Sequence, residues 1–182
     1  MTSQADLATL SIATLASAVK SGELSPVTLT EHMLERARHL NPALKAFNTI
    51  TGENALERAA AAEAEIHQGN YRGPLHGIPV GLKDLLYTRG IQTTVSSKIH
   101  ENWIPDCNAT VVDKLEAAGA ISLGKLNMTE FALSGYHPDY EAPINPWNSK
   151  HWSGVSSSGS GVATAARLCC ATIGTDTGGS IR

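Results

Sequence analysis

Short apolar runs alternate along this chain with longer segments of helical periodicity, and this order restricts the fold more than any other feature. Strand-like runs are expected at residues 46–51, 77–84, 120–123 and 172–175. Between them, apolar residues recur every three or four positions, which indicates amphipathic helices. Strands that alternate with helices are typical of an α/β domain. We therefore predict a mixed β-sheet core covered by helices on both faces.

The helical segments have recognisable boundaries. One helix is predicted to start at Ser25-Pro26, because serine caps free N–H groups and proline fits the first helical position, and to end at Asn41-Pro42. Three further helices are expected over residues 55–67, 109–118 and 163–171, with a loop over 135–152. The chain then divides into an N-terminal helical part, residues 1–70, and a core, residues 71–182.

Composition argues against several classes of function. The 182 residues carry a formal net charge of −3, whereas a protein that binds nucleic-acid backbones needs a basic excess. No apolar run approaches the ~18 residues of a membrane-spanning helix. Residues 1–6 lack the basic start and apolar core of a signal peptide. The three cysteines, Cys107, Cys169 and Cys170, lack metal-site spacing, so we expect no metal and a reduced, cytoplasmic setting.

Lys83, at the end of the apolar run 77–84, is the first candidate for catalysis. Burial there would lower the pKa of its amine, and a neutral amine acts as a general base near pH 7. The alternative is a structural lysine at a strand end, paired with the neighbouring Asp84. The sequence alone leaves both interpretations open.

A cluster of serines between glycines, residues 154–161, is the second candidate. A serine hydroxyl accepts one proton while it donates another, which suits a proton relay. The alternative is a flexible linker. Because residues from 163 onward return to a buried type of sequence, the cluster is expected to lie inside a domain.

The glycine-rich run 174–180 is the third candidate. Successive glycines allow backbone N–H groups to converge on an anion, either a phosphate or the oxyanion of an acyl-transfer intermediate. A phosphate-binding P-loop needs a lysine where Ser180 stands, so phosphate is the weaker interpretation. Ser180 is well placed as a nucleophile beside an oxyanion hole, and a plain turn is the alternative.

A serine nucleophile requires a base. None of the seven histidines lies in a helpful local motif, although the sequence does not exclude a distant one. A simpler arrangement uses Lys83 as base, a serine of the 156–158 cluster as relay and Ser180 as nucleophile. Ser-Lys pairs are a recognised variant of the catalytic triad.

Taken in order, several motifs of this chain resemble the amidase signature family. They are residues 77–84, 124–131, 145–148, 154–160 and 174–182. The resemblance covers most of the chain and is weakest before residue 70. It implies the amidase signature fold and a hydrolase of amide (C–N) bonds that forms an acyl-enzyme, uses a Ser–cis-Ser–Lys triad and needs no cofactor.

The resemblance also implies a role for each site residue. Lys83 corresponds to the base, Ser156 to a bridging serine on a cis peptide, and Ser180 to the nucleophile that becomes acylated. A separation of 24 residues between the two serines agrees with the family pattern. Ser157 is a candidate helper. The implied oxyanion hole consists of the backbone N–H groups of Thr177, Gly178, Gly179 and Ser180.

Two departures from the family pattern bear on these expectations. Val155 stands where glycine is common, at the residue before the bridging serine. The chain also stops two residues after Ser180, whereas family members continue through more strands and much of the substrate pocket. We therefore expect an N-terminal fragment in which residues 71–182 form the first part of the catalytic core. A non-catalytic piece that needs the missing portion is the alternative from another class.

The resemblance leaves two kinds of enzyme open. One is a stand-alone amidase acting on linear small-molecule amides, which is favoured by Val155 and Ser158, since each stands where the family usually has glycine. The other is the glutamine-hydrolysing subunit of a tRNA-dependent amidotransferase, the only case that implies a complex with tRNA. A homodimer of the full-length protein is a further expectation.

Overall fold

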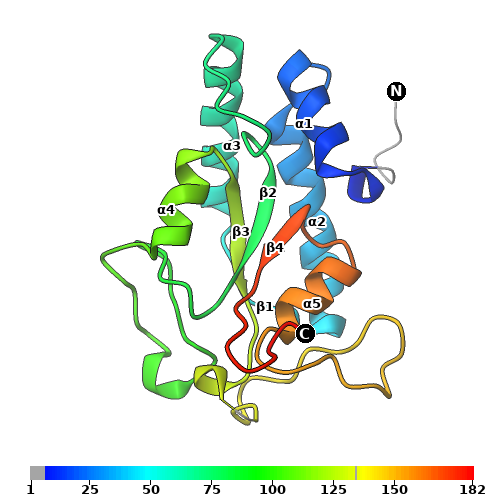
Figure 1. Ribbon diagram of the computed structural model, residues 1–182, viewed down its shortest axis with the longest axis vertical. Helices are drawn as coiled ribbons and strands as arrows, with labels where there is room; N and C mark the ends of the chain where they lie inside the picture. The colour runs from blue at the N-terminus through cyan, green and yellow to red at the C-terminus, as the bar shows by residue number, and fades with distance from the viewer. Residues whose placement is uncertain (1–6, 134) are drawn as a thin grey trace.

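The computed structural model describes residues 7–133 and 135–182 and contains one four-stranded sheet with the order β1-β3-β2-β4 (Figure 1). β1 pairs with β3 in antiparallel fashion, and β2 pairs in parallel with both β3 and β4. The strands are β1 (Phe47–Ile50), β2 (Pro79–Lys83), β3 (Ile121–Leu126) and β4 (Ala171–Ile173). The predicted mixed α/β fold is confirmed. Each strand overlaps its predicted run, but β3 continues to Leu126 and β4 begins at Ala171, which the sequence assigned to a helix.

Five α-helices and three short 3-10 helices accompany the sheet in the described residues. The α-helices are α1 (Ile12–Ser21), α2 (Pro26–Leu44), α3 (Gly52–His67), α4 (Thr110–Ala117) and α5 (Ser158–Ala165). The 3-10 helices are η1 (Leu7–Thr9), η2 (Lys98–His100) and η3 (Glu130–Ala132). Residues 1–6, on which the signal-peptide prediction rests, lie outside the described residues. Within the described residues, no helix combines the length and apolar character needed to cross a membrane.

The start of α2 is confirmed, but its predicted end is wrong by three residues. Ser25 caps the helix by accepting the N–H groups of Val27 and Thr28. The helix continues through Pro42 to Leu44. The physical reason lies in Asn41, whose carbonyl accepts the Lys45 N–H at 2.8 Å and whose carboxamide bonds the backbone of Phe47. These bonds complete a last turn before the chain enters β1.

The predicted helix over 163–171 is wrong, because α5 begins at Ser158 inside the serine cluster and ends at Ala165. Arg167 adopts a left-handed φ of 57°, and this reverses the chain into β4. Gly159 explains the early start: a Cβ there would lie 2.3 Å from the backbone oxygen of Asn127. Close packing against the chain that follows β3 therefore determines where α5 begins, and apolar periodicity does not.

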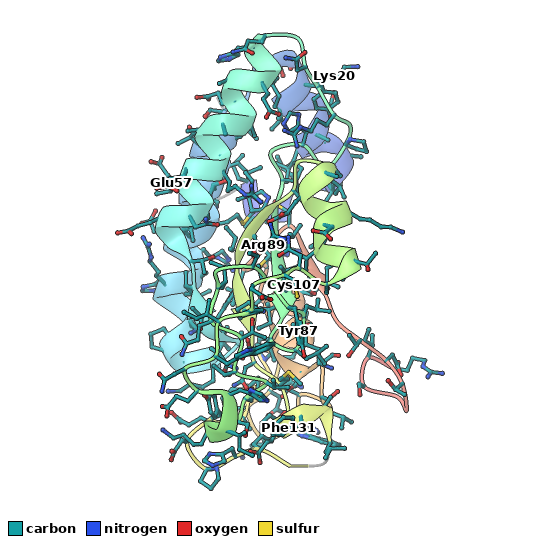
Figure 2. The ribbon with its side chains drawn as sticks, turned by 90° about the vertical axis from the view of Figure 1, so that its left-hand side faces the viewer. Lys20, Glu57, Tyr87, Arg89, Cys107 and Phe131 are labelled. Atoms are coloured by element: carbon teal, nitrogen blue, oxygen red, sulfur yellow. The ribbon has the colours of Figure 1, made fainter. Side chains whose placement is uncertain are left out.

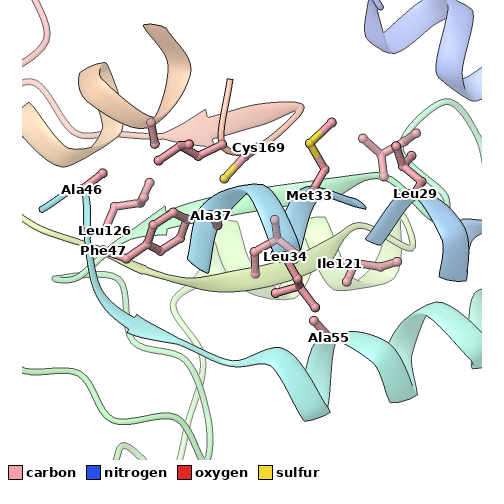
Figure 3. Packing of buried hydrophobic residues seen from close by; sticks show 14 of the residues in the cluster. Leu29, Met33, Leu34, Ala37, Ala46, Phe47, Ala55, Ile121, Leu126 and Cys169 are labelled. Carbon is pink, nitrogen blue, oxygen red and sulfur yellow. The ribbon is translucent and has the colours of Figure 1, made fainter. Parts of the chain in front are cut away.

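Two hydrophobic clusters lie on the two faces of the sheet. The larger one fills the space between α2 and the sheet (Figure 3), and it includes Leu29, Met33, Leu34, Phe47, Ile121 and Leu126. The smaller one lies under α4 and contains Val80, Leu82, Leu86, Val112 and Ala120. The helix over 109–118 is confirmed; Val112 is its buried residue, and Val111 and Leu115 pack partly buried against the same cluster.

The parts before and after residue 70 share one sheet. β1 belongs to the N-terminal part, yet it pairs with β3 at the edge of the sheet. On the face shown in Figure 2, the long connection from β2 to α4 carries Tyr87, Arg89 and Cys107. β2 is thus a central strand with a neighbour on each side, which holds its carboxyl end in place.

Candidate active site

The predicted catalytic residues meet at the carboxyl ends of two neighbouring strands. Lys83 is the last residue of β2, and Ser180 follows β4 in the final loop. Parallel strands end at the same edge of a sheet, so these two segments converge although 97 positions of sequence lie between their residue numbers. Ser156 and Ser157 enter the same space from the turn that begins α5.

A chain of short hydrogen bonds joins these side chains. The Lys83 Nζ donates to the Ser156 Oγ at 2.7 Å and to the Ser157 Oγ at 2.9 Å. The Ser156 Oγ donates in turn to the Ser180 Oγ at 2.6 Å. No histidine of the described chain forms a hydrogen bond with either Ser156 or Ser180. The geometry therefore brings an amine and two hydroxyls into one continuous path.

Burial controls the charge of Lys83. Its side chain is fully buried, and desolvation lowers the pKa of its amine to about 8, while the charge of Asp176 acts in the opposite direction. At pH 7 about a tenth of such an amine is neutral, which is enough for a general base.

The alternative of an ion pair with the neighbouring Asp84 is wrong. Successive residues of a strand point to opposite faces, and Asp84 accepts bonds from Asn48 and Thr94 on the other side. Its nearest ammonium is that of Lys125, at 3.9 Å.

The predicted cis peptide is not present. Every peptide bond between described residues is trans, including the bond from Val155 to Ser156. A cis bond before a residue other than proline costs about 2.5–4 kcal/mol, and the trans chain already places the Ser156 hydroxyl between the amine and Ser180.

The four N–H groups assigned to the oxyanion hole differ in their partners. The N–H of Gly179 donates to the Asp176 carboxylate at 2.6 Å, because that side chain folds back over the turn. Within the described residues, the N–H groups of Thr177, Gly178 and Ser180 have no hydrogen-bond partner. Three of the four donors are thus free, and the fourth is engaged.

Comparison with known proteins decides the family. The Amidase family model matches residues 28–182, which is most of the chain. The chain belongs to the amidase family. It is 48% identical over 173 residues to the AmiD protein of Mycobacterium tuberculosis and covers 36% of that protein. It is also 48% identical over 179 residues to a subunit of glutamyl-tRNA(Gln) amidotransferase from Dehalococcoides mccartyi and covers 37% of it.

Solved structures agree with this assignment to the amidase family. The chain superposes on fatty acid amide hydrolase with a TM-score of 0.93 and 26% identity, covering 100% of this chain and 33% of that one. Peptide amidase from Stenotrophomonas maltophilia gives a TM-score of 0.82 and 37% identity, covering 87% of this chain and 34% of that one. The chain spans about a third of the length of these relatives.

Two residues of this candidate site were not singled out from the sequence. Thr175 places its Oγ1 2.8 Å from the Lys83 Nζ, as a third acceptor for the amine. Asp176 accepts the N–H groups of Gly179, Ile181 and Arg182 and pairs with the Arg182 guanidinium, which holds the pKa of its carboxyl well below the usual range. Both residues belong to the glycine-rich run 174–180, and their polar side chains among glycines were the available signal.

A hollow of about 570 Å³ adjoins the amidase nucleophile candidate. Its lining includes Ser180, Val155, Trp152 and Ile181, so it presents both apolar surface and the Ser180 hydroxyl. A second cavity of about 250 Å³, between α3 and α4, contains none of the residues that contact Lys83. Of these two cavities, only the hollow beside Ser180 adjoins the hydrogen-bonded path from Lys83.

Proposed function

We propose that the protein hydrolyses amide bonds by a Ser–Ser–Lys relay that forms an acyl-enzyme. The observation that carries this proposal is the continuous path from the Lys83 Nζ through the Ser156 Oγ to the Ser180 Oγ, with contacts of 2.7 and 2.6 Å. Membership of the amidase family supports the same chemistry. A small-molecule amide is the proposed substrate.

In this mechanism the neutral Lys83 amine takes the proton of Ser156 while Ser156 takes the proton of Ser180. The Ser180 oxygen forms a bond to the amide carbon, and the carbonyl electron pair moves onto its oxygen. The N–H groups of Thr177, Gly178 and Ser180 are proposed to stabilise that oxyanion, and the loss of one such donor typically costs about 3–4 kcal/mol of barrier.

The tetrahedral intermediate then collapses along the same path. The relay returns a proton to the leaving amine as the C–N bond breaks, which leaves Ser180 acylated. Water, activated by the same relay, then hydrolyses the ester and restores the hydroxyl. Every proton taken up by Lys83 in the first step is returned in the second, so the cycle leaves the protein unchanged.

Active-site labelling tests this proposal. In the full-length protein, a fluorophosphonate is expected to modify Ser180, with the modified peptide identified by mass spectrometry. Lys83→Ala is expected to slow labelling strongly, because the base is lost, whereas Lys150→Ala on the exposed loop should label like the wild type. Labelling of Ser180 that does not depend on Lys83 would refute the relay.

A second candidate function is the glutaminase step of a tRNA-dependent amidotransferase. Its support is that the chain is as similar to the amidotransferase protein of Dehalococcoides mccartyi as to AmiD, with 48% identity in both cases. Glutaminase activity together with co-purification of partner proteins would favour this candidate. Hydrolysis of simple amides by the isolated full-length protein would favour the stand-alone amidase.

The isolated residues 1–182 provide a separate test. We expect no useful turnover from this segment alone, since the relatives are about three times as long and contribute further chain to their folds. Measurable amide hydrolysis by purified 1–182 would contradict that expectation.

A further inference from the structure

The Lys83 amine has a third hydroxyl partner that neither the triad nor the oxyanion hole includes. Thr175 lies in the loop that follows β4, and its Oγ1 accepts from the Lys83 Nζ at 2.8 Å. The Lys83 amine therefore touches Ser156, Ser157 and Thr175 at nearly equal distances of 2.7, 2.9 and 2.8 Å. Counting hydrogens at this amine shows that the three contacts are not equivalent.

Ser157 can act toward Lys83 only as an acceptor. Its hydroxyl hydrogen is committed to the backbone oxygen of Thr175, at 2.8 Å. Its oxygen also accepts the Thr175 N–H at 3.1 Å, so both bonds fix the side chain to the same residue. One N–H of Lys83 is consequently always directed at Ser157.

The contacts with Ser156 and Thr175 must share the one N–H group and the lone pair that remain on the Lys83 amine. A neutral amine has two N–H groups and one lone pair, so after Ser157 one N–H and the lone pair are left. One of these two groups faces Ser156 and the other faces Thr175. If the lone pair faces Thr175, the N–H points at Ser156 and the amine cannot take the Ser156 proton. If the N–H points at Thr175, the lone pair faces Ser156 and the path to Ser180 is open.

We propose that Thr175 is a positioning residue for the amide-hydrolysing reaction: its hydroxyl accepts the second N–H of Lys83 and so directs the lone pair of the amine at Ser156. This inference rests on the proposed function. After proton transfer the ammonium has three N–H groups, and Ser156, Ser157 and Thr175 accept one each. A hydroxyl at position 175 thus serves the amine both before and after it takes the proton.

The charges around Lys83 do not provide this alignment. Asp176 is the carboxylate that acts on the amine, and it is itself paired with Arg182. Asp84 and Lys125 lie together on the opposite face of the sheet. Tyr136, from the loop before α5, bonds Ser158 and not the amine. Within the described residues, only hydroxyl groups form hydrogen bonds with the Lys83 Nζ.

The test uses Thr175→Val, which keeps the shape of the side chain and removes the acceptor, in the full-length protein. The rate of Ser180 acylation by a fluorophosphonate is measured from pH 6 to pH 10. We expect a loss of about tenfold or more, because the remaining N–H then turns toward Ser156. The midpoint of the acidic limb should fall by about one pH unit, since the ammonium loses an acceptor.

Three further variants make the result specific. Thr175→Ser restores the hydroxyl and should recover both the rate and the midpoint. Thr175→Ala removes the hydroxyl without adding bulk, so it serves if the valine variant does not fold. Thr49→Val makes the same change on β1, at the edge of the sheet opposite β4, and should behave like the wild type.

The outcomes separate this inference from the function on which it rests. If wild-type Ser180 is labelled in a Lys83-dependent way but the valine and alanine variants keep the wild-type rate and midpoint, the role of Thr175 is refuted and the relay stands. A slower rate with an unmoved midpoint, or without recovery in Thr175→Ser, refutes it equally, because that pattern indicates a structural effect. Absence of any labelling at Ser180 refutes the proposed function and this inference together.

Discussion

Gly159 is the position where a single methyl group should disturb both the fold and the relay. An ideal Cβ on this residue would lie 2.3 Å from the Asn127 oxygen, 2.6 Å from the Asn127 nitrogen and 2.7 Å from the Ala46 oxygen. These are backbone atoms of two segments held by their own hydrogen bonds, so they cannot turn aside as a flexible side chain can. In Gly159→Ala the start of α5 must therefore move away from the sheet by roughly 1 Å.

The cost follows from that displacement. Overpacking of this kind costs about 3 kcal/mol of unfolding free energy, near the upper end of the usual range. The Gly159 N–H also donates to the Asn127 oxygen at 3.0 Å, and this bond would lengthen. Since Ser156 lies just before α5, the 2.7 Å contact with Lys83 would lengthen too. A misplacement of about 1 Å in a reacting group slows chemistry by about a hundredfold.

Gly161→Ala is the matched control in the same helix. The nearest atom to a Cβ at this position is the Ser153 oxygen, at 4.0 Å, which is an ordinary contact. Replacing a helical glycine by alanine stabilises by about 0.5–1 kcal/mol. The free energies of unfolding of the two variants, measured by urea titration of the full-length protein, should thus differ by about 4 kcal/mol, and Gly159→Ala should be the less stable variant. If Gly159→Ala were as stable as Gly161→Ala and labelled Ser180 at the wild-type rate, the packing argument would be refuted.

Three other predictions concern buried polar groups. Lys125→Met should destabilise by about 3 kcal/mol in denaturant titrations, because it leaves buried acceptors and a carboxylate without their ammonium. Acylation of Ser180 should rise with pH and level off above about 8, since the burial-lowered pKa of Lys83 sets the fraction of neutral amine; a profile flat from pH 6 to 9 would contradict this. Tyr136→Phe removes a 2.6 Å bond to Ser158 and should cost about 1 kcal/mol, seen as faster amide exchange in residues 135–152.

The sequence predicted the elements whose cause is local. Strand β2 is an apolar run that ends on charge, and the start of α2 is a serine cap followed by proline; both were predicted correctly. The end of α2 was not, because the bonds between Asn41 and Phe47 join residues whose approach depends on how β1 enters the sheet. The start of α5 was missed for the same reason, since the chain after β3 supplies the contact.

The register of β3 shows a further limit of pattern reading. Ile121, Leu123 and Leu126 all contribute to the larger cluster, although strict alternation would place the last of them on the opposite face. The sheet register shifts next to Gly124, whose φ of 147° lets the strand pass β1 closely. As a result Lys125 turns to the other face, where its amine bonds the Leu86 oxygen. Such a shift arises from pairing and leaves no periodic signal.

For the site, the sequence identified which side chains to examine but not their hydrogen bonds. Motif order singled out Lys83, Ser156 and Ser180, and the structure brings them together. Thr175 lies in the glycine-rich run 174–180, but the sequence predicts no role for it, because a threonine among glycines is typical of a turn until the amine of Lys83 is placed beside it. Directionality of hydrogen bonds depends on coordinates, and it is this directionality that distinguishes Ser157 from Thr175.

The two faces of the sheet have different consequences when perturbed. On one face, the bond from the Ser157 N–H to the Ser180 oxygen, at 3.2 Å, ties the start of α5 to the loop after β4, and the Lys83 amine at the end of β2 bonds both segments. On the other, Asp84 and Lys125 form a buried pair that does not contact the relay. Substitutions in the buried pair should therefore lower stability without moving the pH midpoint of Ser180 acylation, whereas loss of the Thr175 hydroxyl should move the midpoint with little change in stability. Measuring stability and the pH midpoint for both kinds of variant therefore distinguishes two roles. The buried pair stabilises the end of β2, whereas the Thr175 hydroxyl aligns the Lys83 amine.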